Sequence, residues 1–110
     1  MSTKKTAKTK IDQVHIAGMD VKIVWDEETL REQQATALWV PARETIFLHP
    51  IYRGNNLETM KCLMHEQIHI LSRFMNFEID EATLDSIAQG LAVALAESNI
   101  LDLDQLVFEE

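Results

Sequence analysis

The spacing of apolar residues changes once along this chain, and this change limits the folds open to it. Before residue 49 the apolar residues fall in short β-like runs, and Val21, Ile23 and Trp25 occupy every second position. Such a period of two is typical of half-buried strands. From Leu57 onward apolar residues recur every three or four positions, which is typical of helices packed on a core. Strands followed by helices predict an α+β domain, with a small antiparallel-rich sheet packed on one or two helices.

The first half of the chain predicts two β-hairpins, over residues 11–25 and residues 37–48. Pro41 has no backbone N–H, so the strand that precedes it is expected at an edge or an end of the sheet. Residues 29–35 show no clear period, which leaves both a short helix and a loop open. Residues 49–56 are expected as a loop that leads into the helical half.

The second half predicts two long helices. The first runs from Leu57 to about Met75 with Asn55 as its cap, and the second starts at the cap Asp80 and runs to about Glu97. Apolar residues at helical spacing are expected to fill the core: Leu57, Met60, Met64, Ile68, Leu71 and Met75 in the first helix, and Leu84, Ile87, Leu91 and Leu95 as the buried stripe of the second.

Two further features belong to the C-terminal third. Gly90 lies inside the second predicted helix, where Gly costs up to ~1 kcal/mol relative to Ala. Close packing of the helix on a neighbour would explain a glycine there. Residues 102–108 are predicted to form a last short helix.

The length and composition indicate one globular unit. A chain of 110 residues is the size of one domain, since domains cluster near ~100–150 residues. We expect a single domain over residues 11–110, preceded by a disordered basic tail over residues 1–10. No apolar stretch follows this tail, so no secretory signal is expected. One Cys and no apolar run near ~18 residues predict a cytoplasmic protein without an internal disulfide or a membrane span.

The charge is unevenly distributed. Ten basic residues stand against 18 acidic ones, and four of the ten are Lys4, Lys5, Lys8 and Lys10. Residues 11–110 therefore carry six basic and 18 acidic residues, a net charge of −12. A domain this acidic repels a phosphate backbone, so nucleic acid is not an expected partner. The charge suits a basic protein partner, or it serves solubility alone.

Residues 65–69 of the first predicted helix read His-Glu-Gln-Ile-His, which is an H-E-x-x-H motif. Positions four apart on a helix are offset by about 40° and about 6 Å, so both imidazoles project from one face and can share one metal ion. Glu66 lies about 100° further round, where it can act as general base on a water that the metal holds. Bound Zn²⁺ lowers the pKa of such a water to about 7.

A catalytic zinc site keeps three protein ligands and one open position. No third His follows His69, so the remaining protein ligand must be acidic or come from upstream. The downstream candidates are Glu78, Asp80, Glu81 and Asp85. Asp80 is better explained as a helix cap, and Glu78 as a solvated residue of the connection. Glu81 and Asp85 are one helical turn apart, so Glu81 could bind the metal while Asp85 hydrogen-bonds a ligand imidazole.

The sequence HEQIH followed by EATLD resembles the gluzincin branch of the zinc metallopeptidases. In size it is similar to the minigluzincins and to small zincin-like proteins carried by phages. The resemblance implies that His65, His69 and Glu81 are zinc ligands, that Glu66 is the general base and that Asp85 orients a ligand. It also implies a minimal zincin fold, in which the motif helix packs under a small twisted sheet whose edge strand holds an extended peptide. The substrate is then a peptide or a protein.

Large gluzincins also place a His or Tyr from outside the motif helices near the substrate carbonyl oxygen, where it stabilises the developing oxyanion. In this chain His49, Tyr52 and Arg53 are the nearest candidates, in the loop before the motif helix. No motif selects among them, and a polar surface loop explains each of them equally well.

Three other residues have simpler explanations than metal binding. Cys62 lies nearly in line with His69 on the helix and could approach the metal, but the role of a small buried hydrophobe explains it better. Glu58 shares that face, and the preference of acidic residues for a helix N-terminus accounts for it. His15 lies in the first hairpin and is expected as a half-buried strand residue.

Three functions remain open from the sequence. The first is a zinc-dependent peptidase of gluzincin type, supported by HEQIH together with Glu81 and Asp85. The second is a catalytically weak or inactive module of the same fold that binds a protein partner through its acidic surface. The third is a metal-free interaction domain in which HEQIH is accidental.

Overall fold

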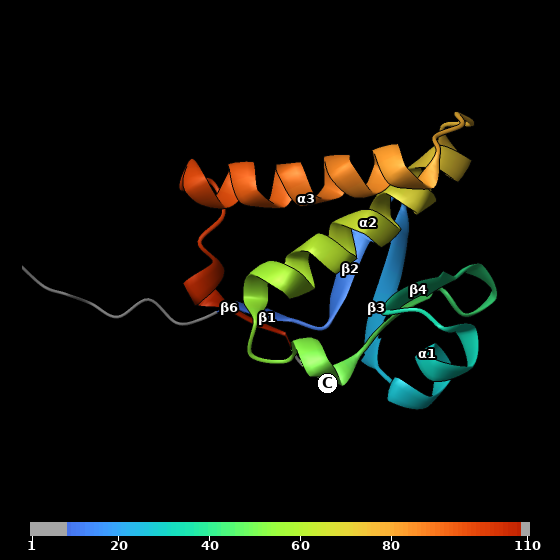
Figure 1. Cartoon of the computed structure of the whole chain (residues 1–110), viewed down its shortest axis with the longest axis horizontal. Coiled ribbons are helices and arrows are strands. Elements are labelled where there is room, and N and C mark those ends of the chain that lie inside the picture. Colours follow the sequence, from blue (N-terminus) through green and yellow to red (C-terminus); the bar gives the residue numbers. More distant parts are fainter. Residues whose placement is uncertain (1–8, 109–110) are drawn as a thin grey trace, which may run out of the picture.

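The computed structural model describes residues 9–108 and confirms the α+β class. The main sheet has four strands in the order β2-β3-β5-β4, and a separate small sheet pairs β1 with β6. Figure 1 shows α2 crossing one side of the main sheet, with α3 packed outside α2. The strands are β1 (Thr9–Ile11), β2 (Gln13–Ile16), β3 (Met19–Trp25), β4 (Ala37–Val40), β5 (Thr45–Leu48) and β6 (Leu106–Phe108).

Both predicted hairpins are confirmed. β2 pairs antiparallel with β3, and β4 pairs antiparallel with β5, while the central pair of β3 and β5 is parallel. β4 is an edge strand, as Pro41 predicts, because no further strand follows it in the sheet. Residues 29–35, left open by the sequence, lie mostly in the short helix α1 (Glu27–Gln33), whose start is capped by Asp26.

The two long helices are confirmed within one residue of their predicted starts. α2 (Asn56–Phe74) is capped by the Asn55 side chain, which accepts a hydrogen bond from the Glu58 backbone N–H. α3 (Glu81–Glu97) is capped by Asp80, which accepts from the backbone N–H and the hydroxyl of Thr83. Each cap satisfies a backbone donor that the first helical turn leaves without a partner.

The core lies between α2 and the main sheet. α2 buries one residue per turn on this side, namely Thr59, Leu63, Glu66 and Ile70. Leu63 and Ile70 pack in one cluster with strand residues Val21, Ile23, Ile46 and Leu48. The predicted apolar series on α2 lies on another side of the helix. Met60 and Met64 are half-buried there, and the expectation that Met75 fills the core is wrong, since it is 64% exposed.

The predicted buried stripe of α3 is also partly wrong. α3 buries Leu84, Ala88 and Ala92, whereas Ile87 and Leu91 are 42% and 48% exposed. The reason is that helix contacts follow the residues that allow close approach, and two alanines let α3 lie close along α2. Ile87 and Leu91 then fall to one side of the contact line.

The two ends of the described chain meet in a way that the sequence does not predict. The expected last helix is wrong: residues 103–105 form a 3₁₀ turn and residues 106–108 form β6, which pairs parallel with β1. The boundary of the predicted tail is corrected as well, because Thr9 and Lys10 belong to β1. The Asn56 side chain holds this region by donating to the carbonyls of Leu103 and Leu106. The remainder of the predicted tail, residues 1–8, lies outside the described residues.

Across residues 9–108 no helix has both the length and the apolar character needed to cross a membrane.

Candidate metal centre

The HEQIH motif lies at the centre of α2, and it lines a groove of about 430 Å³. One wall of this groove is the segment that leads into the edge strand, residues 34–38. The other wall is formed by residues of α2 and α3, namely Lys61, Cys62, His65, Glu66, His69, Glu81 and Asp85. The groove therefore brings together every predicted ligand, the predicted base and the open edge of β4.

The two histidines of the motif face the groove from successive turns of α2. Their ring centroids are 5.1 Å apart and their planes are inclined by 55°. This placement follows directly from the four-residue spacing on a regular helix. His65 is more enclosed than His69, because α3 covers it from the opposite side through Asp85.

Glu81 reaches both histidines from the first turn of α3. Its Oε1 atom lies 2.6 Å from His65 Nε2, and its Oε2 atom lies 3.3 Å from His69 Nε2. One carboxylate thus contacts two imidazole nitrogens that point into the same space. Two imidazoles and one carboxylate are a donor set that suits divalent zinc and related ions.

A metal ion could be held here by a second combination of residues. Ligand atoms of His65, Glu66 and His69 lie within 4.8 Å of one another. We favour Glu81 over Glu66 as the third ligand because Glu66 already uses one oxygen: its Oε1 accepts the backbone N–H of Trp39 at 2.7 Å. Both oxygens of Glu81 instead face the histidines. Either combination gives two imidazoles and a carboxylate, so these residues could hold a metal ion.

Asp85 contacts Nδ1, the second ring nitrogen of His65. Its Oδ1 atom lies 3.1 Å from His65 Nδ1, and its Oδ2 atom accepts a hydrogen bond from Gln89 at 2.6 Å. When His65 Nδ1–H donates to Asp85, the Nε2 lone pair is free to bind a metal. Gln89, which the sequence reasoning did not single out, in turn fixes the carboxylate.

Glu66 is buried, with 6% of its surface exposed. Burial raises the pKa of this carboxyl, and the charge of His65 and the Trp39 N–H oppose the rise. A carboxylate that is partly desolvated is a stronger base than one in water. Its second oxygen, Oε2, lies 3.9 Å from His65 Nε2, so it faces the space that a metal-held water would occupy.

The bond from Trp39 to Glu66 follows from the pairing of β4. Trp39 is opposite Ile46 in the β4–β5 register, and its N–H points away from β5 toward α2. In an antiparallel ladder alternate residues point to opposite edges, so the Ala37 backbone shares this open edge. The open edge of β4 consequently faces the groove. In the sequence, only Pro41 indicated that backbone groups of β4 would be free to face the groove. It predicts an edge strand, and edge strands leave backbone groups unpaired.

Cys62 also lines the groove, one turn before Glu66. It packs against the hydrophobic core, and burial raises the pKa of its thiol to about 11. The charges of the acidic groups Glu58, Glu66 and Asp85 contribute to this rise. A thiol in this state is unreactive near neutral pH, in line with the role of a small hydrophobe.

The predicted oxyanion candidates do not join this groove. His49 caps a 3₁₀ turn by accepting from the Ile51 N–H, and the Tyr52 carbonyl accepts from the Thr59 hydroxyl. Neither residue lines the groove, and nor does Arg53. The expectation for His15 is corrected as well: it is exposed on the first hairpin, 2.6 Å from Asp20, because its strand is at the other edge of the sheet.

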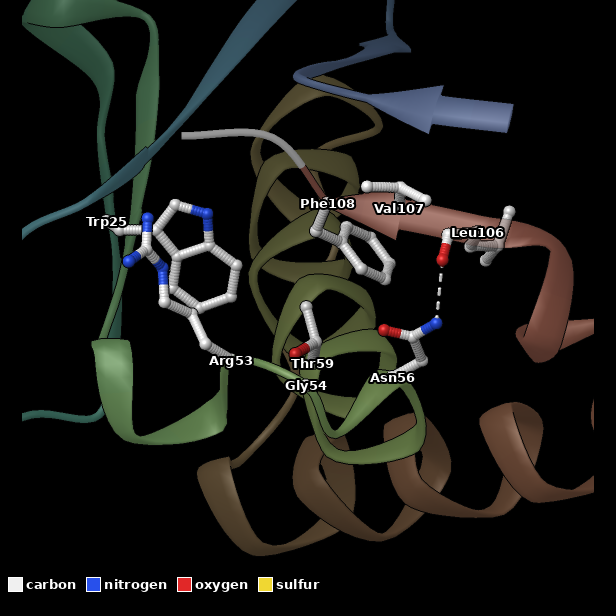
Figure 2. Close-up of a pocket in the computed structure, with 8 residues that line it drawn as sticks. All are labelled: Trp25, Arg53, Gly54, Asn56, Thr59, Leu106, Val107 and Phe108. Atoms are coloured by element: carbon white, nitrogen blue, oxygen red, sulfur yellow. Dashed lines mark hydrogen bonds between the residues drawn. The ribbon is translucent and has the colours of Figure 1, made fainter. Parts of the chain in front are cut away.

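A second cavity of about 430 Å³ lies at the N-terminal end of α2 (Figure 2). The Arg53 guanidinium lies over the Trp25 ring, 5.5 Å from its centroid, and Phe108 faces the cavity from β6. The Asn56 amide closes one side through its bond to the Leu106 carbonyl. No His, Cys, Asp or Glu is among the described residues that line it.

Comparison with known proteins adds no relative. No family model matches the chain, no curated protein is significantly similar to it, and no solved structure matches its fold significantly. Function must therefore be argued from the groove itself.

Proposed function

We propose that this protein is a zinc-dependent peptidase of the gluzincin type. The observation that carries the proposal is the contact of one Glu81 carboxylate with Nε2 of both motif histidines. Asp85 adds to it by holding the opposite nitrogen of His65. These residues come from two helices, and their convergence at one point is hard to explain by helix packing alone.

The metal would be held by His65, His69 and Glu81. A bound Zn²⁺ supplies a Lewis acid for the substrate carbonyl and a water of lowered pKa. Glu66 would accept the proton of the attacking water through Oε2 and pass it to the leaving amine nitrogen. The bond from Trp39 N–H to Oε1 fixes the carboxylate in one orientation during both transfers.

The substrate would be an extended peptide segment. The open edge of β4 forms one wall of the groove, and the backbone of Ala37 is available there for pairing with a peptide strand. Main-chain pairing of this kind places a peptide carbonyl beside the histidines and selects little for sequence. It also requires a flexible substrate, since the segment must leave its own fold to lie along β4 inside the groove.

The test measures zinc content and peptide cleavage on the same preparations. We expect the gently purified protein to hold close to one zinc per chain and Glu81→Ala to hold much less. Glu66→Gln is expected to keep the zinc and to lose cleavage of an unstructured peptide mixture, read by mass spectrometry, by on the order of 10²–10⁴-fold.

Three outcomes would contradict the proposal. Wild-type cleavage by Glu66→Gln would remove the base from the mechanism. A folded protein without zinc, which takes up none on titration, would remove the metal site and leave the metal-free interaction domain. Zinc binding without any cleavage would favour the second candidate function, a metal-bearing binding module that acts on a protein partner.

A further inference from the structure

α3 carries an exposed apolar strip on the side that faces away from the metal groove. At 100° per residue, Ile87, Leu91 and Ala94 lie within one narrow sector of the helix, and Gly90 lies beside them. We call Ile87, Gly90, Leu91 and Ala94 the apolar flank of α3. All four are exposed, and Leu91 keeps 48% of its surface in solvent. Asp85 and Gln89 lie on the opposite side, toward the groove.

Gly90 has no explanation inside the described chain. A Cβ atom built on it would have no heavy atom within 4 Å, so neither a close neighbour nor a positive φ requires glycine here. Glycine weakens a helix relative to alanine. A helix surface without side chains at one point does allow another backbone to approach closely, which is how a partner element would use it.

The segment that carries this flank has charged residues of one sign only. Residues 74–110 contain nine acidic residues and no Lys, Arg or His. Three of the acids, Glu78, Asp80 and Glu97, are exposed at or near the two ends of α3. A second copy of the same surface would bring like charges together, which disfavours self-association. A partner with basic residues around an apolar stripe would find both its apolar and its charged groups complemented.

We propose that the apolar flank of α3 is a docking surface for a basic amphipathic helix of a partner protein. The partner helix lays its apolar stripe on Ile87 and Leu91, approaches closely over Gly90 and directs its Lys and Arg side chains toward the acidic ends of α3. This interaction uses groups outside the metal groove, so it goes beyond the proposed peptidase function and does not depend on it.

The test uses the full chain carrying Glu66→Gln, so that cleavage of the probe cannot obscure binding. The probe is a synthetic helical peptide of roughly 18 residues with Leu at i, i+4 and i+7 spacing and Lys on its other faces. One comparison peptide replaces Lys by Glu, and another replaces the Leu stripe by Ser. Binding is measured by fluorescence anisotropy at two salt concentrations.

We expect only the basic, Leu-striped peptide to bind, and more weakly at higher salt. Leu91→Ser should weaken binding roughly tenfold, because it removes one exposed aliphatic contact. Gly90→Phe should weaken it at least as much by blocking close approach. Ile51→Ser is the matched control, since Ile51 is 73% exposed but lies outside α3, and it should leave binding unchanged.

Several results would overturn the proposal. They are failure of the striped basic peptide to bind, equal binding of either comparison peptide, and unchanged binding by both flank variants when circular dichroism shows them folded. A dimer in sedimentation equilibrium that Leu91→Ser abolishes would assign the flank to a second copy instead. Loss of peptidase activity or of zinc would leave the docking result standing, so the two proposals fail separately.

Discussion

The two flanks of α3 differ although they belong to one helix and share one buried side. On the polar flank, Glu81 and Asp85 contact His65 and His69 at 2.6 to 3.3 Å, and Gln89 donates a hydrogen bond to Asp85. The apolar flank, with Ile87 and Leu91, meets no comparable set of partners and stays exposed. The polar side chains thus have specific partners although 67% of the Glu81 side chain and 50% of the Asp85 side chain are exposed, so the two flanks differ in their contacts rather than in their exposure.

This difference teaches that hydrophobicity alone does not set the packing line of α3, which buries two alanines together with Leu84. Ala88 and Ala92 bring α3 close to α2, and that closeness carries Glu81 to the histidines. A helix that buried Ile87 and Leu91 instead would be rotated, and its carboxylates would turn away from the groove. The exposed aliphatic residues are in this sense a consequence of the packing that brings Glu81 to the histidines.

The largest expected effect is a loss of stability from a substitution on the buried side of α3, which lies between the two flanks. Leu84 is completely buried on α3, and Leu84→Ala should destabilise the protein by about 2–5 kcal/mol. Urea unfolding followed by circular dichroism measures it, with Leu91→Ala as the matched control. The control should change stability much less because Leu91 is half in solvent. Equal losses would mean that α3 packs through Leu91 as well.

The next largest effect is on zinc affinity, which should depend on the polar flank and not on the apolar flank. Asp85→Asn keeps the size of the side chain but weakens the hold on His65 Nδ1, so zinc affinity should fall about 10–100-fold. Competition with a chromogenic chelator measures it. Leu91→Ser, on the other flank, should leave zinc affinity unchanged. A comparable loss in that variant would couple the two flanks and remove the contrast between them.

A smaller effect is expected at Gly90, in the opposite direction. Gly90→Ala should stabilise the isolated protein by up to about 1 kcal/mol, because alanine favours a helix and the added methyl group meets no atom. Thermal unfolding measures this gain. The same variant should weaken binding of the basic helical peptide. Destabilisation by alanine would show that a neighbour fills the space beside Gly90 within this chain.

The smallest effect concerns the cap from which both flanks start. The backbone N–H of Thr83 and then its hydroxyl hold the pKa of Asp80 below its ordinary value of 3.8. Because the folded pKa is the lower one, the ionised carboxyl stabilises the fold at pH values above the unfolded pKa. This contribution is lost as pH falls through the folded pKa.

Asp80→Asn tests this dependence, since Asn also caps helices but does not titrate. Urea midpoints of the wild type and the variant should differ slightly at pH 7 in favour of the wild type. The difference should shrink when both are measured near pH 3. A difference that grows on acidification would contradict the assignment of the lowered pKa to this cap.

Much of the fold could be predicted because its signals are local. The caps Asn55 and Asp80 and the edge position of β4 each follow from one or two neighbouring residues. The side of a helix that is buried could not be predicted in the same way. Leu91 and Ala92 both suit a buried position, and only the position of α2 decides between them.

The candidate site, too, could be predicted where its signals are local and not where they depend on tertiary structure. The spacing of His65 and His69 and that of Glu81 and Asp85 predicted which groups would share a face, and the structure brings all four together. The hydrogen bond from the Trp39 N–H to Glu66 could not be predicted in this way. The direction in which this N–H points depends on the register of β4 with β5, which the spacing of side chains does not reveal.

The pairing of β1 with β6 has a consequence for the order in which the molecule is made. Thr9 and Leu106 are neighbours in space and 97 positions apart in sequence. Chains are synthesised from the N-terminus, so β1 cannot pair with β6 until nearly the last described residue has left the ribosome. The three groups proposed to bind zinc are complete by residue 81. A nascent chain could therefore bring these groups together before its two ends are joined.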